Sequence, residues 1–283
     1  MPKARKKPAD DIRLMVVFSD LHSGSRRSLM PPEYALFEEG GMGQIIKANK
    51  QQLWLYDCWC RGWEKVIEYI GADPWAWVFN GDAVEGAHRK LTELVSNDPT
   101  DHMIIFDKLN RQYAELAAKR FFVRGTGVHT GDTMEMKLAE KLGCERHPDS
   151  GHWAPDRWMI NVNGFNVLLR HHMQTTSREY LRGSALTIEF GNEVVASINR
   201  GQPVPQGCVF AHRHGYDWWD GGTTFAMVCG PWQQTTRYGH TKWSPMIPQP
   251  TITVLDWRDS PPGGMPRNKT FMFSPQSSTV VTL

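Results

Sequence analysis

The stretch that decides the fold is Leu14-Met15-Val16-Val17-Phe18-Ser19-Asp20-Leu21-His22-Ser23-Gly24. Its five leading apolar residues, two of them β-branched, predict a strand that is buried on both faces. Asp20 and His22 follow the strand with one residue between them. Because functional groups of an open α/β sheet lie just beyond the carboxyl ends of its strands, these two side chains are candidate functional residues.

Four more short apolar runs end in residues of the same kinds. The runs at 75–80, 121–123, 165–170 and 208–210 are followed by Gly81-Asp82, by Gly125 to His129, by His171-His172 and by His212-Arg213-His214. A single histidine after a strand is more often a structural residue than a ligand. Carboxylates and imidazoles after five strands indicate instead a site for Zn, Mn, Fe or a similar ion, and the absence of a thiolate disfavours structural zinc.

The order of the expected elements indicates the fold class. Strands at 12–19, 75–80 and 121–123 alternate with helices at 49–70, at 99–119 and from 132 or 133 to 142. A hairpin around Asn163-Gly164 follows, then a helix at 176–199 and strands near 208–210, 223–229, 251–257 and 271–273. We therefore expect an α/β fold in which a mostly parallel sheet and a mixed sheet pack together with helices outside.

The domain organisation follows from composition along the chain. Residues 1–11, with Lys3, Arg5, Lys6 and Lys7, are predicted to be a disordered basic tail. A single catalytic domain is expected at 12–260, with a long loop insertion at 23–48, and a C-terminal extension at 261–283. Tryptophans of the 49–70 helix, such as Trp59 and Trp63, recur at helical spacing and are expected in the core rather than on a base-stacking surface.

The bulk composition excludes several classes of protein. The chain has 283 residues, 40% hydrophobic and 22% charged, and a net charge of +2, which by itself gives no argument for nucleic acid. No apolar run approaches the roughly 20 residues of a transmembrane helix, and the basic start does not lead into a signal-peptide core. Five cysteines without zinc spacing or a disulfide pattern indicate a reduced, cytoplasmic setting.

The ordered residues resemble a known family. The series Asp20-x-His22, Gly81-Asp82, a glycine-to-histidine element at 125–129, His171 and His212-x-His214 resembles the calcineurin-like metallophosphoesterases. The pattern of that family runs D-x-H, G-D, G-N-H-E/D, H and G-H-x-H, each after a strand, and the resemblance covers about residues 12–230. It implies a two-sheet sandwich flanked by helices, a four-layer architecture. Both a DNA-repair-exonuclease-like branch and a phosphatase branch fit the pattern.

The resemblance also implies roles for residues. One metal ion would be bound by Asp20, His22 and His214, a second by His171 and His212, with His172 as the weaker alternative to His171. Asp82 would bridge the two ions, and His129 would be the catalytic histidine that assists the leaving group. The ions would be two divalent cations, with Mn²⁺ favoured and Zn²⁺, Fe²⁺ or Ni²⁺ as alternatives.

The third element departs from the family pattern. Thr126 stands where the family has its metal-binding asparagine if Gly127-Val128 is an insertion, and Val128 stands there in the other alignment. In either alignment the second ion has a weaker ligand set than the first, since a hydroxyl is a weak ligand and valine is none. The glycines at 125, 127 and 131 only superficially resemble a dinucleotide-binding loop, because their spacing is not the standard one.

The implied function is hydrolysis of a phosphate ester by metal-bound hydroxide at a dinuclear site. A phosphodiesterase or nuclease is favoured, because the basic tail and candidate substrate contacts Arg124, His88 and Arg89 suit a polyanion. A phosphomonoesterase or nucleotide phosphatase is the alternative within the same chemistry. A degraded scaffold that serves as a binding module is the alternative from another class. The expected partner is the phosphate-ester substrate, with nucleic acid as one candidate, and the oligomeric state is open.

Overall fold

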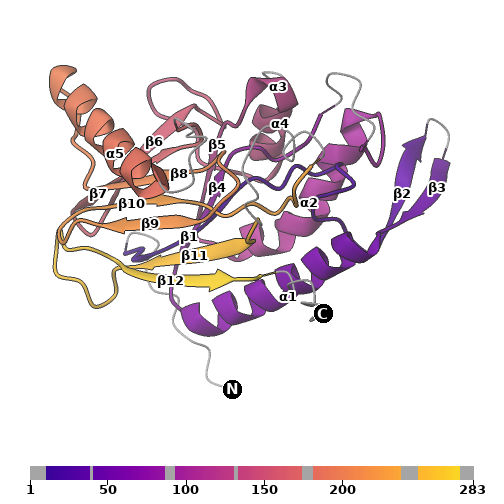
Figure 1. The fold of residues 1–283 in the computed structure, drawn as a ribbon, viewed down its shortest axis with the longest axis horizontal. Coiled ribbons are helices and arrows are strands. Elements are labelled where there is room, and N and C mark those ends of the chain that lie inside the picture. The colour runs from indigo at the N-terminus through magenta and orange to yellow at the C-terminus, as the bar shows by residue number, and fades with distance from the viewer. Residues whose placement is uncertain are drawn as a thin grey trace, which may run out of the picture.

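The computed structural model describes residues 11–38, 41–86, 93–130, 133–173, 181–236 and 248–274. Two five-stranded sheets dominate this part of the chain, and a separate two-stranded hairpin lies beside them. Figure 1 shows the long helix α1 (Lys50–Ile70) along one side of the molecule and α5 (Arg182–Asn199) at the opposite corner. The α/β class that the sequence predicts is confirmed.

The first sheet is built around the opening stretch. Its strands are β1 (Leu14–Phe18), β4 (Ala76–Asn80), β5 (Lys119–Val123), β11 (Thr251–Asp256) and β12 (Arg267–Met272), in the order β12-β11-β1-β4-β5. The β1–β4 and β4–β5 pairs are parallel, whereas β11 pairs antiparallel with both β1 and β12. The sheet is therefore mixed rather than mostly parallel, because the C-terminal strands return to its free edge.

The second sheet also contains both parallel and antiparallel pairs. Its order is β6-β7-β8-β10-β9, with β6 (Arg157–Val162), β7 (Phe165–Arg170), β8 (Gly207–Phe210), β9 (Asp217–Asp220) and β10 (Phe225–Val228). The central pairs β7–β8 and β8–β10 are parallel, and the outer pairs are antiparallel. Asn163 and Gly164 join β6 to β7 with φ values of 53° and 80°, which is the left-handed turn that Asn-Gly favours.

The strands and helices form four layers. Residues such as Met15, Val78, Leu169 and Met227 meet between the two sheets. On the far side of the first sheet, β1 and β4 pack against α1, α2 (Pro99–Leu116) and α4 (Met134–Lys141). On the far side of the second sheet, β8 and β10 pack against α5. This is the metallophosphoesterase-like architecture that the sequence predicts, and its two central sheets place their strand ends next to one another (Figure 1).

Helix α1 covers the first sheet with aromatic side chains. Asn49 caps its start in a capping box with Gln52, and Gly71, at a φ of 65°, ends it. Phe18 of β1 makes edge contacts with Trp59 and Trp63, whose ring centroids lie 5.4 and 5.5 Å away. Both tryptophans are buried. The prediction that they belong to the core is confirmed.

Some expected boundaries change. The expected loop insertion at 23–48 contains a hairpin, β2 (Glu33–Glu38) with β3 (Gly41–Lys47), which was missed because prolines and glycines around it obscure its short alternation. Helix α2 ends at Leu116, earlier than expected, because β5 already begins at Lys119. Strand β9 was not foreseen. The start of the 176–199 helix, and the basic tail up to residue 10, lie outside the described residues.

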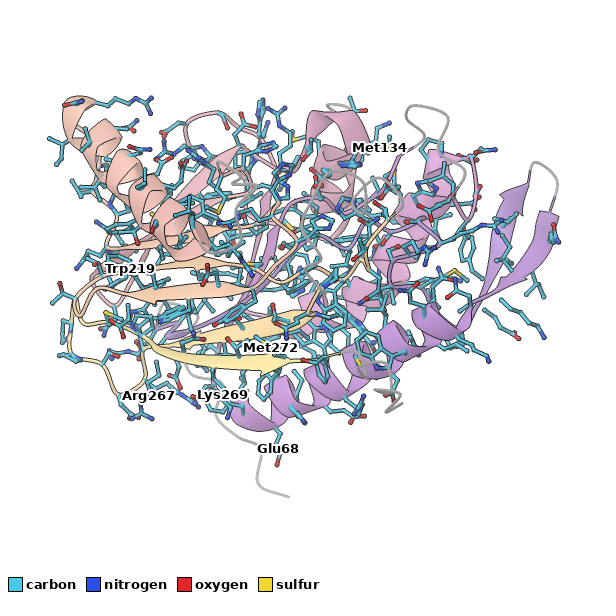
Figure 2. All side chains as sticks on the ribbon, viewed as in Figure 1. Glu68, Met134, Trp219, Arg267, Lys269 and Met272 are labelled. Carbon is cyan, nitrogen blue, oxygen red and sulfur yellow. The ribbon has the colours of Figure 1, made fainter. Side chains whose placement is uncertain are left out.

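The division into one domain at 12–260 and an extension stays a prediction, although β12 of that extension completes the first sheet. Figure 2 shows Arg267 and Lys269 along β12, and both side chains are exposed on this edge strand. Charged side chains on an edge oppose pairing with another chain. Among the described helices, none combines the length and the apolarity that crossing a membrane requires. All five cysteines are free thiols.

Candidate metal centre

Five loops meet at one edge of the two sheets. Strands β1, β4 and β5 are parallel neighbours in the first sheet, and β7 and β8 are parallel neighbours in the second. Their carboxyl ends therefore point the same way within each sheet. Buried Asn80, the last residue of β4, joins the two sheets by donating to the backbone carbonyls of Arg170 (3.3 Å) and Val209 (3.2 Å). The loops that follow these strands carry the predicted side chains.

The backbone of these loops is strained at the predicted residues. Six described residues other than glycine have positive φ, and one of them, Asn163, lies in the hairpin turn. The other five are predicted ligands, with φ between 44° and 70°: Asp20, His22, Asp82, His212 and His214. Such conformations are costly for residues with a Cβ, and they concentrate at functional sites where the surrounding structure imposes them.

Close contacts around the β4 and β5 loops explain why Gly81 and Gly125 are glycines. A Cβ on Gly81 would lie 2.4 Å from His171 Nδ1, and a Cβ on Gly125 would lie 2.1 Å from the Asp82 nitrogen. Both loops are also bridged by buried Glu135 of α4, whose carboxylate accepts from the backbone N–H of Ala83 (2.8 Å) and of Gly125 (2.6 Å). Any side chain larger than hydrogen at either glycine would push the loops apart.

The first group of candidate ligands contains Asp20, His22 and His214. One ligand atom from each lies within 4.8 Å of the other two. His22 Nε2 lies 3.1 Å from His214 Nε2, and His214 Nε2 lies 3.5 Å from Asp20 Oδ1. Asp20 Oδ1 is fully buried and makes no hydrogen bond. Two imidazole nitrogens and an unpartnered carboxylate oxygen that face one another are a suitable donor set for a divalent transition ion.

The second group surrounds Asp82. Asp82 Oδ2 lies 3.1 Å from His171 Nε2, 3.6 Å from His22 Nε2 and 4.0 Å from His212 Nδ1. Asp82 thus contacts histidines of both groups, as a bridging carboxylate would. His171 Nε2 is buried without a hydrogen-bond partner, whereas its Nδ1 lies 2.6 Å from the Asn80 carbonyl oxygen. A carbonyl contact of this kind fixes the tautomer that leaves Nε2 for a metal ion.

Thr126 lies at the second group. Its backbone N–H donates to Asp82 Oδ1 (2.5 Å), and its hydroxyl lies 3.2 Å from both Asp82 Oδ2 and His212 Nδ1. Of the two alignments that the sequence leaves open, the structure therefore favours the one in which Thr126 takes the asparagine position. The hydroxyl contributes one weak ligand atom there, and His172 also comes within reach of His171 and His212.

The charges at the centre are strongly coupled. Burial would raise the pKa of Asp82, but His171, His212 and His22 around it hold that pKa well below its usual range. Burial would lower the pKa of His22, but the hydrogen bond to Glu85 and the surrounding carboxylates raise it to about 9. Burial would likewise lower the pKa of His171, but Asp82 and other neighbours raise it to about 10. Without a metal ion these two imidazoles carry protons at neutral pH.

These pKa values predict that a rise in pH strengthens metal binding and destabilises the metal-free protein. A metal ion must displace protons from His22 and His171, so apparent affinity is expected to rise between pH 6 and 8, by up to about tenfold per pH unit for each proton displaced. The two protonated imidazoles stabilise the metal-free fold. This stabilisation is fully present below about pH 6.5 and is lost as pH rises through 9 to 10. Calorimetric titration in buffers of different ionisation enthalpy measures the protons released; an affinity that does not change from pH 6 to 8 would contradict this.

Glu85 is a site residue that the sequence reasoning missed. Its Oε2 lies 3.1 Å from His22 Nδ1 and accepts a hydrogen bond of 2.7 Å from Gln233. Burial would raise its pKa, but the interaction with His22 brings it down to about 2, so Glu85 is charged. A signal was present, since Glu85 is a carboxylate three residues after Asp82 in an otherwise apolar segment. Its contact with Nδ1 directs His22 Nε2 toward the first group.

Substituting Glu85→Gln is expected to weaken metal binding at the first group by about 10- to 100-fold, because the carboxylate that orients and polarises His22 is removed. Equilibrium titration of the metal-free protein measures the change. Glu115→Gln is the matched control, since that side chain is exposed on α2 and pairs with Arg111. Equal affinities for the two variants would show that Glu85 has no such role.

His129 lies beside the first group without being one of its three members. It is on the short helix α3 (Gly127–Thr130), and its ring centroid is 4.7 Å from that of His22. Its Nδ1 lies 3.2 Å from the carbonyl oxygen of Glu85 and 3.9 Å from the Glu85 carboxylate. The side chain is one-fifth exposed, so unlike His22 it can reach a bound substrate.

The candidate substrate contacts are less well placed. Arg124 forms an ion pair with the exposed Asp156, at 2.6 Å, and a substrate contact by Arg124 stays a prediction. His88 and Arg89 lie outside the described residues. The structure thus brings together the predicted metal ligands and His129, and it adds Glu85.

Comparisons with known proteins concern the fold. No family model matches the chain, and no curated protein matches its sequence. Among solved structures, it is similar to an archaeal phosphodiesterase (10% identity, 92% of this chain and 99% of the other, TM-score 0.42) and to Vps29 of Entamoeba histolytica in complex with zinc (12%, 92% and 98%, 0.38). It is also similar to the Thermus thermophilus sulfate thiohydrolase SoxB (11%, 97% and 57%, 0.42).

The chain has a metallophosphoesterase-like fold. The four layers and the five loops, in their order along the chain, support this statement. Identities near 10% carry nothing about activity, so function has to be argued from the side chains.

Proposed function

We propose that this metallophosphoesterase-like protein is a metal-dependent phosphodiesterase whose substrate is a nucleic acid. The observation that carries the proposal is the convergence of Asp20, His22, Asp82, His171, His212 and His214 from four loops. Buried Asp20 Oδ1 makes no hydrogen bond there. Strained backbone at five of these residues adds support, because strain of this kind is retained where a site requires it.

The donor set fits two divalent ions. Asp20, His22 and His214 would hold the first, His171 and His212 the second, and Asp82 would contact both. Mn²⁺ is the favoured ion, with Zn²⁺, Fe²⁺ and Ni²⁺ as alternatives, because mixed carboxylate and imidazole ligands suit all four. When bound, such a pair supplies Lewis acidity toward phosphoryl oxygens and lowers the pKa of water.

The protein side chains supply orientation and a proton. His129 Nδ1 faces the carbonyl of Glu85, and Nε2 would act on the leaving oxygen of the ester. Protonated at Nε2, His129 would give that oxygen a proton as the ester bond breaks, a contribution of about 10²- to 10⁴-fold for a positioned general acid. Glu85, which contacts both His22 and His129, would polarise the first imidazole and stabilise the positive charge on the second.

The choice of a phosphodiester follows from charge and stays within the proposal. The tail at residues 1–7 and Arg89 are cationic and suit a polyanion, and Arg124 lies next to the third loop. A phosphomonoesterase or nucleotide phosphatase uses the same centre and is the second candidate. A reducing, cytoplasmic location is part of the proposal as well, supported by five free thiols.

A binding module without activity is the remaining candidate, favoured by Thr126 at a ligand position. The discriminating experiment is a substrate panel: single-stranded DNA, duplex DNA, RNA, nucleotides and chromogenic mono- and diesters, each with Mn²⁺. We expect diester cleavage above monoester cleavage. Faster monoester cleavage would make the protein a phosphatase, and binding without cleavage of any member would favour the module.

A further inference from the structure

His172 forms a cluster with two of the candidate ligands. One ligand atom from each of His171, His172 and His212 lies within 4.8 Å of the other two. The three rings meet edge to face, with centroids 4.9 Å apart for His172 and His212 and 5.1 Å apart for His171 and His172. His171 is fully buried, His212 is half-buried and His172 is exposed, so the cluster leads from the buried Asp82 to the surface.

The ring nitrogens of His171 and His212 face other groups of the metal centre. His171 uses Nδ1 for the Asn80 carbonyl, and its buried Nε2 has no hydrogen-bond partner while lying 3.1 Å from Asp82 Oδ2. His212 Nδ1 is 3.2 Å from the Thr126 hydroxyl. In the metal-free protein this Nε2 faces the Asp82 carboxylate, and a metal ion that displaces the proton between them would bind both side chains.

The backbone at His172 is held in position. Arg170 Nε donates to the His172 carbonyl oxygen at 2.7 Å. The same guanidinium pairs with Glu189 and Glu193, two buried carboxylates of α5. The ring of His172 is therefore carried on a segment fixed between β7 and α5, and its position beside His212 needs no rearrangement of the loop.

We propose that His172 is a ligand of the second metal ion, which is held by three imidazoles together with Asp82, while the Thr126 hydroxyl is secondary. This deepens the proposed function and rests on its two-ion centre. A site with three imidazoles and one carboxylate prefers a borderline transition ion such as Zn²⁺, Co²⁺ or Ni²⁺ to Mg²⁺ or Ca²⁺. The nitrogen-rich second site and the more oxygen-rich first site would then differ in metal preference.

The test counts metal ions in the full-length protein. Metal-free wild type, His172→Ala, His172→Asn and the control His152→Ala, an exposed histidine outside the cluster, are titrated with Co²⁺ and followed by absorption, calorimetry and elemental analysis. We expect two ions in wild type and control. In His172→Ala, one ion should bind as in wild type and the other at least tenfold more weakly, with an altered Co²⁺ spectrum; His172→Asn should be intermediate.

Two equally tight ions in His172→Ala, or an equal loss of both in a variant with wild-type circular dichroism, would overturn the inference. A wild type that binds only one ion would also overturn it, even if the protein hydrolyses diesters. The proposed function fails separately, through a wild type that binds two ions and cleaves no ester.

Discussion

Substituting Asp82→Asn is expected to abolish tight metal binding and to lower diester turnover by at least about 10³-fold. Asp82 Oδ2 lies near histidines of both groups, so its charge attracts both ions. Asparagine keeps the shape and one acceptor for the Thr126 N–H but lacks the charge. Removal of a charge at the shared position should weaken both sites together.

Thermal melting separates this effect from misfolding. Wild-type protein should melt at a higher temperature when a divalent ion is added, and the Asp82→Asn protein should not. Asp156→Asn is the matched control, because Asp156 is a highly exposed carboxylate paired with Arg124. If the Asp82→Asn protein keeps two ions per chain at wild-type affinity, Asp82 is not a bridging ligand.

Substituting His129→Ala has a different expected signature. Turnover should fall by about 10²- to 10⁴-fold, the usual contribution of a general acid, while metal content stays near that of wild type. The ring of His129 adjoins His22 but is bonded to the Glu85 backbone carbonyl, so the first group retains Asp20, His22 and His214 without it. Steady-state rates and elemental analysis of the same preparation measure both quantities.

The leaving group provides a second readout for His129. A substrate with a very acidic leaving phenol needs little protonation, so it should lose much less rate in His129→Ala than an alkyl ester does. Exposed His152 serves again as the control histidine. A loss of metal together with activity would identify His129 as a ligand, which its position near His22 and Asp82 also permits geometrically.

Much of the candidate site could be predicted from the chain because strand ends are strongly marked in it. Asp20, Asp82 and His171 each come just after a mostly apolar strand, and parallel neighbouring strands bring such ends together. The core role of Trp59 and Trp63 also followed from helical spacing alone. Local patterns of this kind predict structure well because each strand or helix buries its own apolar side chains.

The rest depends on contacts between distant segments. Glu85 contacts His22 and Gln233, which lie 63 and 148 residues away along the chain, and its place after Asp82 does not reveal these two partners. The sequence left open whether Thr126 takes the asparagine position of the family pattern, and the contacts of its hydroxyl with Asp82 and His212 favour that alignment. Strands β11 and β12 made the first sheet mixed because an open sheet edge beside β1 was available to them.

The most direct test of the central claim is diester hydrolysis by wild-type protein whose metal has been removed with a chelator and then restored with Mn²⁺. A chromogenic diester such as bis(p-nitrophenyl) phosphate serves as substrate, and metal content is measured in each sample. A two-ion phosphoesterase should show no turnover without metal and recovered turnover as the second ion binds. Protein that carries the ions and still shows no turnover with Mn²⁺, Zn²⁺, Fe²⁺ or Ni²⁺ would contradict the account.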